Sequence, residues 1–151
     1  MRILHIIPSL DQSGAEKQLA LAALHLPKEK YELHVCAVTR GGYYESVLRN
    51  AGVPVHVIGK RLKFDPFTYY RLVKHIKEVK PDVVQTWIFA GNAYGRVAAR
   101  QAKVPRIIAS ERCVDEWKSG YHFHIDRFLM RWTDRVVVNA DAIARFYSEQ
   151  G

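Results

Sequence analysis

Six short apolar runs recur along the chain at the spacing of alternating strands and helices. Their first residues lie 30, 23, 27, 24 and 29 positions apart, and the runs cover residues 2–7, 32–38, 55–58, 82–86, 106–110 and 135–138. This spacing leaves room for one crossover helix between successive strands, whereas hairpins need shorter connections. The runs are rich in Val, Ile and Leu, which is typical of parallel strands covered on both faces. The sequence therefore predicts an α/β fold, a doubly wound and mostly parallel six-stranded sheet with helices on both faces.

Segments of helical periodicity separate the apolar runs. The predicted helices cover residues 15–26, 44–51, 66–79, 90–102, 121–133 and 142–150. Ser13 is the expected N-cap of the first helix. On the fourth helix, the period of 3.6 predicts a sheet-facing side made of Ala90, Ala93, Tyr94, Val97 and Ala98.

Size and composition indicate one globular domain over residues 1–151. The chain has 48% hydrophobic and 25% charged residues, which is typical of a folded soluble protein. Cys36 and Cys113 are too far apart in sequence to suggest a disulfide framework or a zinc cluster. We therefore expect a reducing, cytoplasmic setting and no bound metal. No apolar run approaches the length of a membrane span.

The chain is basic, with a formal net charge of +8. Such a balance suits nucleic acid, an anionic membrane surface or phosphorylated ligands, or one lobe of a larger protein. No helix-turn-helix, zinc or RNP-like pattern is present, so nucleic acid is not the expected partner. Two basic stretches contain aromatic residues, the loop 60–67 and the segment 117–132. Each fits either an interface with anionic lipid or aromatic packing beneath solvated charges.

In a parallel sheet of this kind, ligands bind beyond the carboxyl ends of the strands. This rule selects the loops that follow the predicted strands, which are residues 8–14, 40–42, 60–61, 87–91, 110–112 and 139–141. The first of these loops places Gly14 at a helix N-terminus, where backbone amides can approach an anion; an ordinary capped turn is the alternative. Neither GxGxxG nor a P-loop is present, which disfavours an NAD-linked oxidoreductase.

The residues at the ends of the second and fifth predicted strands include charged side chains that are candidates for binding a ligand. Arg40 precedes two glycines and can either reach an anionic group or stay solvated. At the fifth strand, Ser110, Glu111 and Arg112 bring together a hydroxyl, a carboxylate and a guanidinium. Arginine suits bidentate recognition of phosphate or carboxylate, and the alternative is a local Glu–Arg pair of little energetic value.

Four segments together resemble the N-terminal domain of a family 4 glycosyltransferase of the GT-B fold. They are ILHIIPSLDQSGAEKQLALAA at residues 3–23, PDVVQTWIFAGNAYGRVAAR at 81–100, RIIASERCVDEWK at 106–118 and RWTDRVVVNADAIARFYSEQG at 131–151. The order and spacing of these segments carry the resemblance, which covers most of the chain.

The resemblance implies roles for individual residues. Gly14, followed by Ala15, matches a family glycine whose amide faces the donor phosphates. Ser110 matches a Thr or Ser position at the acceptor pocket. Trp87 and Arg112 stand where many members carry histidines. Arg112 does not act as a neutral base near pH 7, so we expect it to support a phosphate or leaving group electrostatically.

The resemblance also implies the reaction. The chain is expected to be the acceptor-binding, Rossmann-like half of a retaining hexosyltransferase that takes a sugar from a nucleotide-sugar donor without a metal or other cofactor. A donor-binding C-terminal lobe is expected as its partner, so the chain alone should be inactive. Glu111 and Arg112 are the candidate catalytic residues, and Arg40, Trp87, Ser110 and Arg112 the candidate acceptor-binding residues. The acceptor class implied is a lipid-linked or polysaccharide precursor at the inner face of a membrane. Two alternatives remain, a nucleotide-sugar epimerase lobe and a non-enzymatic module that binds nucleic acid or a partner protein.

Overall fold

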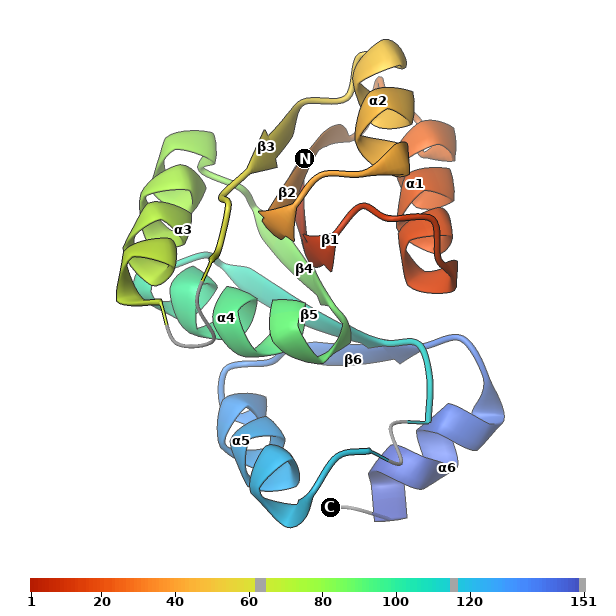
Figure 1. The fold of residues 1–151 in the computed structure, drawn as a ribbon, viewed down its shortest axis with the longest axis vertical. Coiled ribbons are helices and arrows are strands. Elements are labelled where there is room, and N and C mark those ends of the chain that lie inside the picture. The colour runs from red at the N-terminus through yellow and green to blue at the C-terminus, as the bar shows by residue number, and fades with distance from the viewer. Residues whose placement is uncertain (62–64, 115–116, 150–151) are drawn as a thin grey trace.

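Strands and helices alternate along the whole chain, as the spacing predicts (Figure 1). The computed structural model describes residues 1–61, 65–114 and 117–149. The strands are β1 (Arg2–Ser9), β2 (Glu32–Arg40), β3 (Val55–Val57), β4 (Val83–Trp87), β5 (Arg106–Glu111) and β6 (Arg135–Val138). The helices are α1 (Gly14–His25), α2 (Tyr43–Asn50), α3 (Pro66–Val79), α4 (Ile88–Gln101), α5 (Gly120–Met130) and α6 (Asp141–Glu149).

The six strands form one sheet in the order β3-β2-β1-β4-β5-β6. Every pairing between neighbouring strands is parallel, so the predicted doubly wound sheet is confirmed. The strand order reverses between β1 and β4. At such a reversal the connections on the two sides diverge and leave a crevice beyond the carboxyl ends of the strands.

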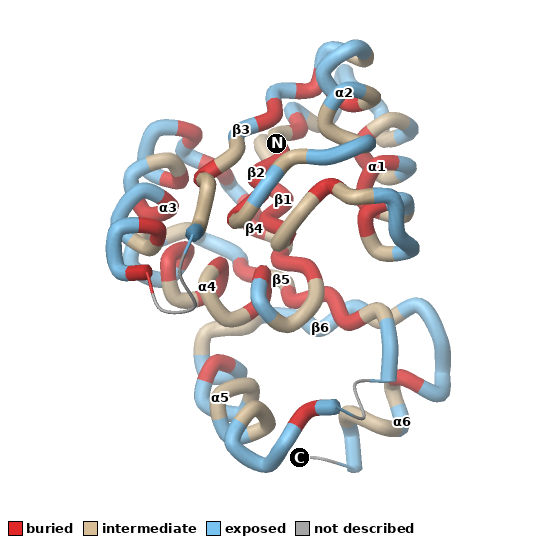
Figure 2. The backbone as a smooth tube through the Cα atoms, viewed as in Figure 1, coloured by how far each residue is buried: buried red, intermediate tan, exposed pale blue. Residues whose placement is uncertain are grey.

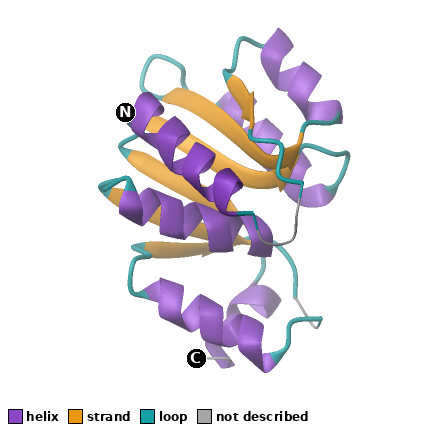
Figure 3. Cartoon of the chain, turned by 60° about the vertical axis from the view of Figure 1, so that its left-hand side comes forward, coloured by secondary structure: helices purple, strands orange, loops and turns teal. Residues whose placement is uncertain are grey.

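Helices cover the sheet in two layers, with the buried residues concentrated along the strands between them (Figures 2 and 3). Leu72, Val73 and Ile76 of α3 and Ala98 and Ala99 of α4 pack with strand residues into one core cluster. On the other face, residues of α1 and α2 form a second cluster that includes Trp87 at the end of β4. Both faces of the central strands are therefore covered, which explains why their sequences are mostly apolar.

The junction of β4 and α4 differs from the prediction. Residues 87–91 form no loop, because the helix begins at Ile88, directly after the strand. Ile88 has a φ of 50°, a strained conformation for a β-branched residue. The sharp turn brings the uncapped N-terminus of α4 to the carboxyl edge of the sheet.

The sheet-facing side of α4 matches the prediction only in part. Its buried residues are Gly91, Asn92, Gly95, Arg96, Ala98 and Ala99. The two glycines let the helix lie close to the sheet. A β-carbon added at Gly91 would lie 3.0 Å from the Ile6 carbonyl oxygen, and one at Gly95 would lie 2.5 Å from the Thr86 methyl group. Of the predicted residues, Ala98 is buried and Tyr94 packs partly buried against the core, so alanine-rich periodicity identified only part of the sheet-facing side.

Substituting Gly95 by Ala tests this close approach. The new β-carbon would clash with Thr86, which is fully buried, so we expect the free energy of unfolding to fall by about 1–3 kcal/mol, as for other overpacked cores. Urea denaturation measures the change. Gly120→Ala is the control, because its added β-carbon meets nothing within 4 Å; an equal loss of stability in both variants would contradict the close packing of α4.

The C-terminal part of the chain is less covered than the rest. Of the residues in α5, only Leu129 is buried, and Val136 and Val137 of the edge strand β6 are 40% and 37% exposed. Within the parts of the chain that the structure describes, every helix is too short or too polar to cross a membrane. Lys63 and Phe64 of the predicted basic loop lie outside the described residues.

Candidate functional site

Two side chains link β1 and β4, the neighbouring strands between which the strand order reverses. Trp87, at the end of β4, donates a hydrogen bond from Nε1 to Nδ1 of His5 on β1, at 3.1 Å. Both side chains are buried, at 1% and 2% exposure. This bond joins the two strands immediately below the place where the topology predicts a ligand.

His5 is held as a neutral imidazole. Because Nδ1 accepts the tryptophan hydrogen bond, the ring proton lies on Nε2, which has no hydrogen-bond partner among the described residues. Burial, together with the smaller effect of the nearby positive charge of Arg112, lowers the pKa of His5 to about 4. Protonation would place a second buried cation beside Arg112.

Arg112 covers this pair from the edge of the sheet. Its guanidinium carbon lies 4.3 Å from the centre of the Trp87 ring. Its Nε is buried without a hydrogen-bond partner, and burial lowers the pKa of the side chain. The described residues provide it with no ion pair. A partly buried cation without a counter-ion is costly, and an anionic ligand at this edge would supply the missing partner.

The pH dependence of folding tests the neutral state of His5. Its pKa is about 4 in the folded protein and about 6.5 when unfolded, so the folded state binds fewer protons between these values. The free energy of unfolding should therefore be constant above pH 6.5 and fall as the pH drops toward 4, by about 3 kcal/mol from this group. The half-buried His75, stacked on His56, also has its pKa lowered to about 4 by burial and by two neighbouring histidines, and it adds to the same fall.

Urea denaturation between pH 7 and 4.5 measures this effect. The variant His75→Phe should keep part of the slope, since His5 still titrates. A wild-type protein whose stability is unchanged over this range would contradict burial of the two neutral rings.

Gly14 and Ala15 open α1 just beyond β1, at the same edge as Arg112. Ser13 is the N-cap residue, as predicted, but its hydroxyl donates to the Glu16 carboxylate and caps no backbone amide. A β-carbon at Gly14 would meet nothing within 4 Å. The first turn of α1 thus presents its backbone amides without a side-chain cap, a geometry suited to an anion.

Arg40 lies at this edge on the other side of β1. Its Nη2 is 2.5 Å from Asp11 Oδ2, in the loop that follows β1. The hydrogen bond from Arg40 holds the pKa of Asp11 below its usual range. Exposed pairs of this kind contribute little stability, but this one ties the end of β2 to the loop that leads to Gly14.

Ser110 and Glu111, in contrast, are below the surface. The Ser110 hydroxyl accepts a hydrogen bond from Gln85 Nε2 at 2.7 Å, and the side chain is fully buried. Glu111 accepts from Asn92 Nδ2 at 2.7 Å and pairs with Lys118 Nζ at 3.6 Å. Neighbouring residues of a strand point to opposite faces, so Glu111 and Arg112 do not form the local pair that was one reading of the sequence.

Glu111 belongs to a buried network that connects four elements. Lys118 also contacts Asp126 Oδ2 at 3.1 Å and donates to the Tyr147 hydroxyl at 2.8 Å. Asp126 Oδ1 in turn lies 2.5 Å from Arg96 Nη2. The network joins α4, β5, α5 and α6 through charges that compensate one another.

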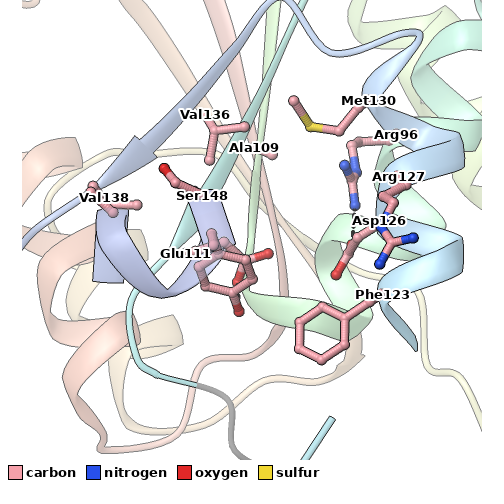
Figure 4. A pocket seen from close by; sticks show the side chains of 12 residues that line it. Arg96, Ala109, Glu111, Phe123, Asp126, Arg127, Met130, Val136, Val138 and Ser148 are labelled. Atoms are coloured by element: carbon pink, nitrogen blue, oxygen red, sulfur yellow. Dashed lines mark hydrogen bonds and ion pairs between the residues drawn. The ribbon is translucent and has the colours of Figure 1, made fainter. Parts of the chain in front are cut away.

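Four residues of this network, Arg96, Glu111, Asp126 and Tyr147, line a hollow of about 480 Å³ between β5, β6, α5 and α6 (Figure 4). Its floor carries the Arg96–Asp126 pair and Glu111, and the rest is largely apolar, including Ala109, Phe123, Met130, Val136 and Val138. Arg112 and Trp87 are not among its lining residues. The hollow is therefore separate from the edge where β1 and β4 diverge.

Sequence reasoning identified the edge but missed several residues that organise it. His5 lies inside a strand, and Asn92 and Arg96 lie inside a helix, where polar residues are normally read as solvent-exposed. Their spacing gives a signal, because Asn92 and Arg96 follow Gly91 and Gly95 directly and so share the side of the helix that packs most closely. No group of three or more His, Cys, Asp or Glu residues within 1–61, 65–114 and 117–149 is placed to hold a metal ion.

A parallel sheet whose strand order reverses between β1 and β4, with helices on both faces, has the Rossmann-like architecture of GT-B enzymes. The family model of Glycosyltransferase Family 4 matches residues 12–151. The chain belongs to this family, which confirms the resemblance seen in its sequence.

Solved structures of GT-B glycosyltransferases and related epimerases share the fold. Anabaena Alr3699/HepE in complex with UDP matches with a TM-score of 0.83 and 18% identity, over 100% of this chain and 41% of that one. Acinetobacter baumannii MurG matches with a TM-score of 0.66 and 15% identity, over 94% and 41%. UDP-GlcNAc 2-epimerase from Methanocaldococcus jannaschii matches with a TM-score of 0.64 and 15% identity, over 100% and 43%. The chain thus spans about two fifths of each of these proteins. No curated protein sequence gives a significant match.

Proposed function

We propose that this chain is the acceptor-side lobe of a retaining glycosyltransferase that transfers a hexosyl unit from a nucleotide sugar. Family membership gives the reaction class. The observation that carries the proposal is the stacking of Arg112 on Trp87 at the strand reversal, where the described residues provide its guanidinium with no ion pair. A donor-binding lobe, in the same chain or another, would cover this edge and complete the site, and no metal or other cofactor is required.

Arg112 is the residue of this lobe that would stabilise negative charge during the reaction. Transfer from a nucleotide sugar leaves a negative charge on the departing diphosphate, and a guanidinium already desolvated and oriented stabilises such charge effectively. The indole of Trp87 fixes the plane of the guanidinium and is itself too buried to stack on a sugar. Arg112 therefore supports the leaving group or an anionic acceptor and does not serve as a base.

The other candidates take supporting roles. The amides of Gly14 and Ala15 would face the donor phosphates, in keeping with the UDP bound in the HepE structure. Arg40 would lie at the far side of the acceptor. Ser110 would contact acceptor only after losing its bond to Gln85, and Glu111 positions the lobe through its buried network rather than touching substrate.

An epimerase is the second candidate, because several structural neighbours are described as UDP-GlcNAc 2-epimerases. HepE superposes with a higher TM-score than the M. jannaschii epimerase, 0.83 against 0.64, which favours the transferase. A module that binds nucleic acid or a protein is not favoured by any contact described above.

Transfer and epimerisation differ in the molecule that carries the sugar after the reaction. The enzyme containing this lobe should be incubated with labelled UDP-sugars and a lipid or oligosaccharide acceptor extract. We expect release of UDP, label on the acceptor and retention of the anomeric configuration. Label that stays on UDP in an epimerised sugar would establish the alternative, and inversion would disprove a retaining mechanism.

The acceptor class we propose is a lipid-linked or polysaccharide precursor, used at the inner face of a membrane. The basic charge of the chain supports a peripheral association with anionic lipid.

A further inference from the structure

Exposed large apolar side chains gather in one part of the molecule. Of the twelve among the described residues, seven fall between positions 114 and 137. They are Val114, Trp117, Tyr121, Phe128, Met130, Val136 and Val137. Exposed apolar side chains concentrated in one segment point to an interaction site.

The outward side of α5 combines aromatic rings with positive charge. Residues three, four and seven apart share one side of a helix, and on α5 this places Tyr121, His124, Phe128 and Arg131 together, with Arg127 beside them. All five are exposed. The guanidinium of Arg131 lies 5.2 Å from the centre of the Phe128 ring.

The acidic groups of the same segment are engaged by other parts of the protein. Between residues 117 and 138 the only carboxylates are Asp126 and Asp134. Asp126 is bound by Arg96 and Lys118 in the buried network, and Asp134 accepts a hydrogen bond from the Ile107 amide at 2.7 Å. The outward side of α5 is thus aromatic and cationic, with no carboxylate of its own.

We propose that this side of α5 is a docking surface for an anionic lipid bilayer, with the helix lying in the plane of the membrane interface. Tyr121 and Phe128 would enter the headgroup region, as aromatic residues do at bilayer interfaces. Arg127 and Arg131 would contact lipid phosphates. A second copy of the chain is a poorer occupant, because it would bring arginines against arginines.

Helix α3 is the nearest alternative surface and provides a matched control. Phe67 and Tyr70 are 77% and 69% exposed, but the basic residues beside them are already paired. Arg71 lies 3.9 Å from Asp65, and Lys74 lies 3.9 Å from Glu78. The charge that α3 offers to lipid is therefore partly neutralised.

Sedimentation with vesicles tests the assignment. The chain should bind vesicles of mixed phosphatidylglycerol and phosphatidylcholine, bind pure phosphatidylcholine weakly, and lose binding as salt rises. The double variant Arg127→Gln/Arg131→Gln should bind the mixed vesicles about 30-fold more weakly. Tyr121→Ser/Phe128→Ser should lose binding while keeping its circular dichroism spectrum, and Phe67→Ser/Tyr70→Ser should bind like the wild type.

Several outcomes would overturn the proposal. They are unchanged vesicle binding in the α5 variants, an equal loss in the α3 control, or equal affinity for neutral vesicles. Tight binding of an oligonucleotide or self-association through the same residues would assign α5 to another partner. The proposal deepens the membrane association suggested above, but vesicle binding needs no transfer activity, so either idea can fail without the other.

Discussion

Replacing Lys118 by Met is expected to lower the free energy of unfolding by about 3–5 kcal/mol, the usual cost of breaking a buried ion pair. The Lys118 side chain is fully buried and contacts both Glu111 and Asp126. Asp126 keeps its pair with Arg96, whereas Glu111 would lose its ion pair with Lys118. The loss should be visible by urea denaturation, with α6 loosened first because Tyr147 donates to Glu111 and accepts from Lys118.

Two further variants separate the network from a general effect of losing a lysine. Lys77→Met, on the exposed side of α3, should change stability by no more than about 0.5 kcal/mol. The double variant Glu111→Gln/Lys118→Met should be more stable than the sum of the single effects predicts, because it leaves no uncompensated carboxylate. If Lys118→Met behaves like Lys77→Met, the buried network does not hold the C-terminal helices.

Replacing Arg112 by Gln is expected to reduce transfer by the two-lobed enzyme about 100-fold in kcat, as removal of a preorganised group that stabilises developing charge does. Arg112→Lys should restore little, because an ammonium neither stacks on Trp87 as a plane nor binds an anion bidentately. The measurement is steady-state release of UDP from the nucleotide sugar.

Stability and a distant arginine provide the controls for Arg112. Because burial disfavours the Arg112 cation and the described residues provide it with no ion pair, Arg112→Gln should leave the free energy of unfolding unchanged or raise it. Arg100→Gln, at the exposed end of α4, should leave transfer unchanged. If Arg112→Gln retained full activity, the proposed role of this residue would be wrong; a parallel loss of stability would make its role structural.

The fold followed closely from sequence because each strand carries its own signal. β6 and α3 have the predicted bounds, and the other elements differ by a few residues at their ends, where fraying and capping decide the boundary. The main error was at α4, where a loop was expected at 87–91. The sequence gives no signal for the turn at Ile88, because isoleucine does not favour a positive φ. The packing of the surrounding structure imposes this conformation.

The position of the candidate site could be predicted from the sequence, but the burial and contacts of several of its residues could not. Parallel strands alone bring Gly14, Arg40 and Arg112 to one edge, so topology sufficed for these. The burial of Ser110 and Glu111 depends on partners 18 to 25 positions away in the sequence, which no local pattern reveals. Asn92 and Arg96 were missed for the same reason, because a polar residue on a buried helix side makes sense only once its partners are known.

The central claim is that the edge where β1 and β4 diverge is the anion-facing part of the lobe. Titration of the ¹⁵N-labelled chain with inorganic pyrophosphate, followed by NMR, tests it directly. The backbone amides of Gly14 and Ala15 and the Nε–H of Arg112 should shift together and saturate together, and Arg112→Gln should weaken the binding. Shifts confined to the hollow between α5 and α6, or no shift at Gly14 and Arg112, would contradict the claim.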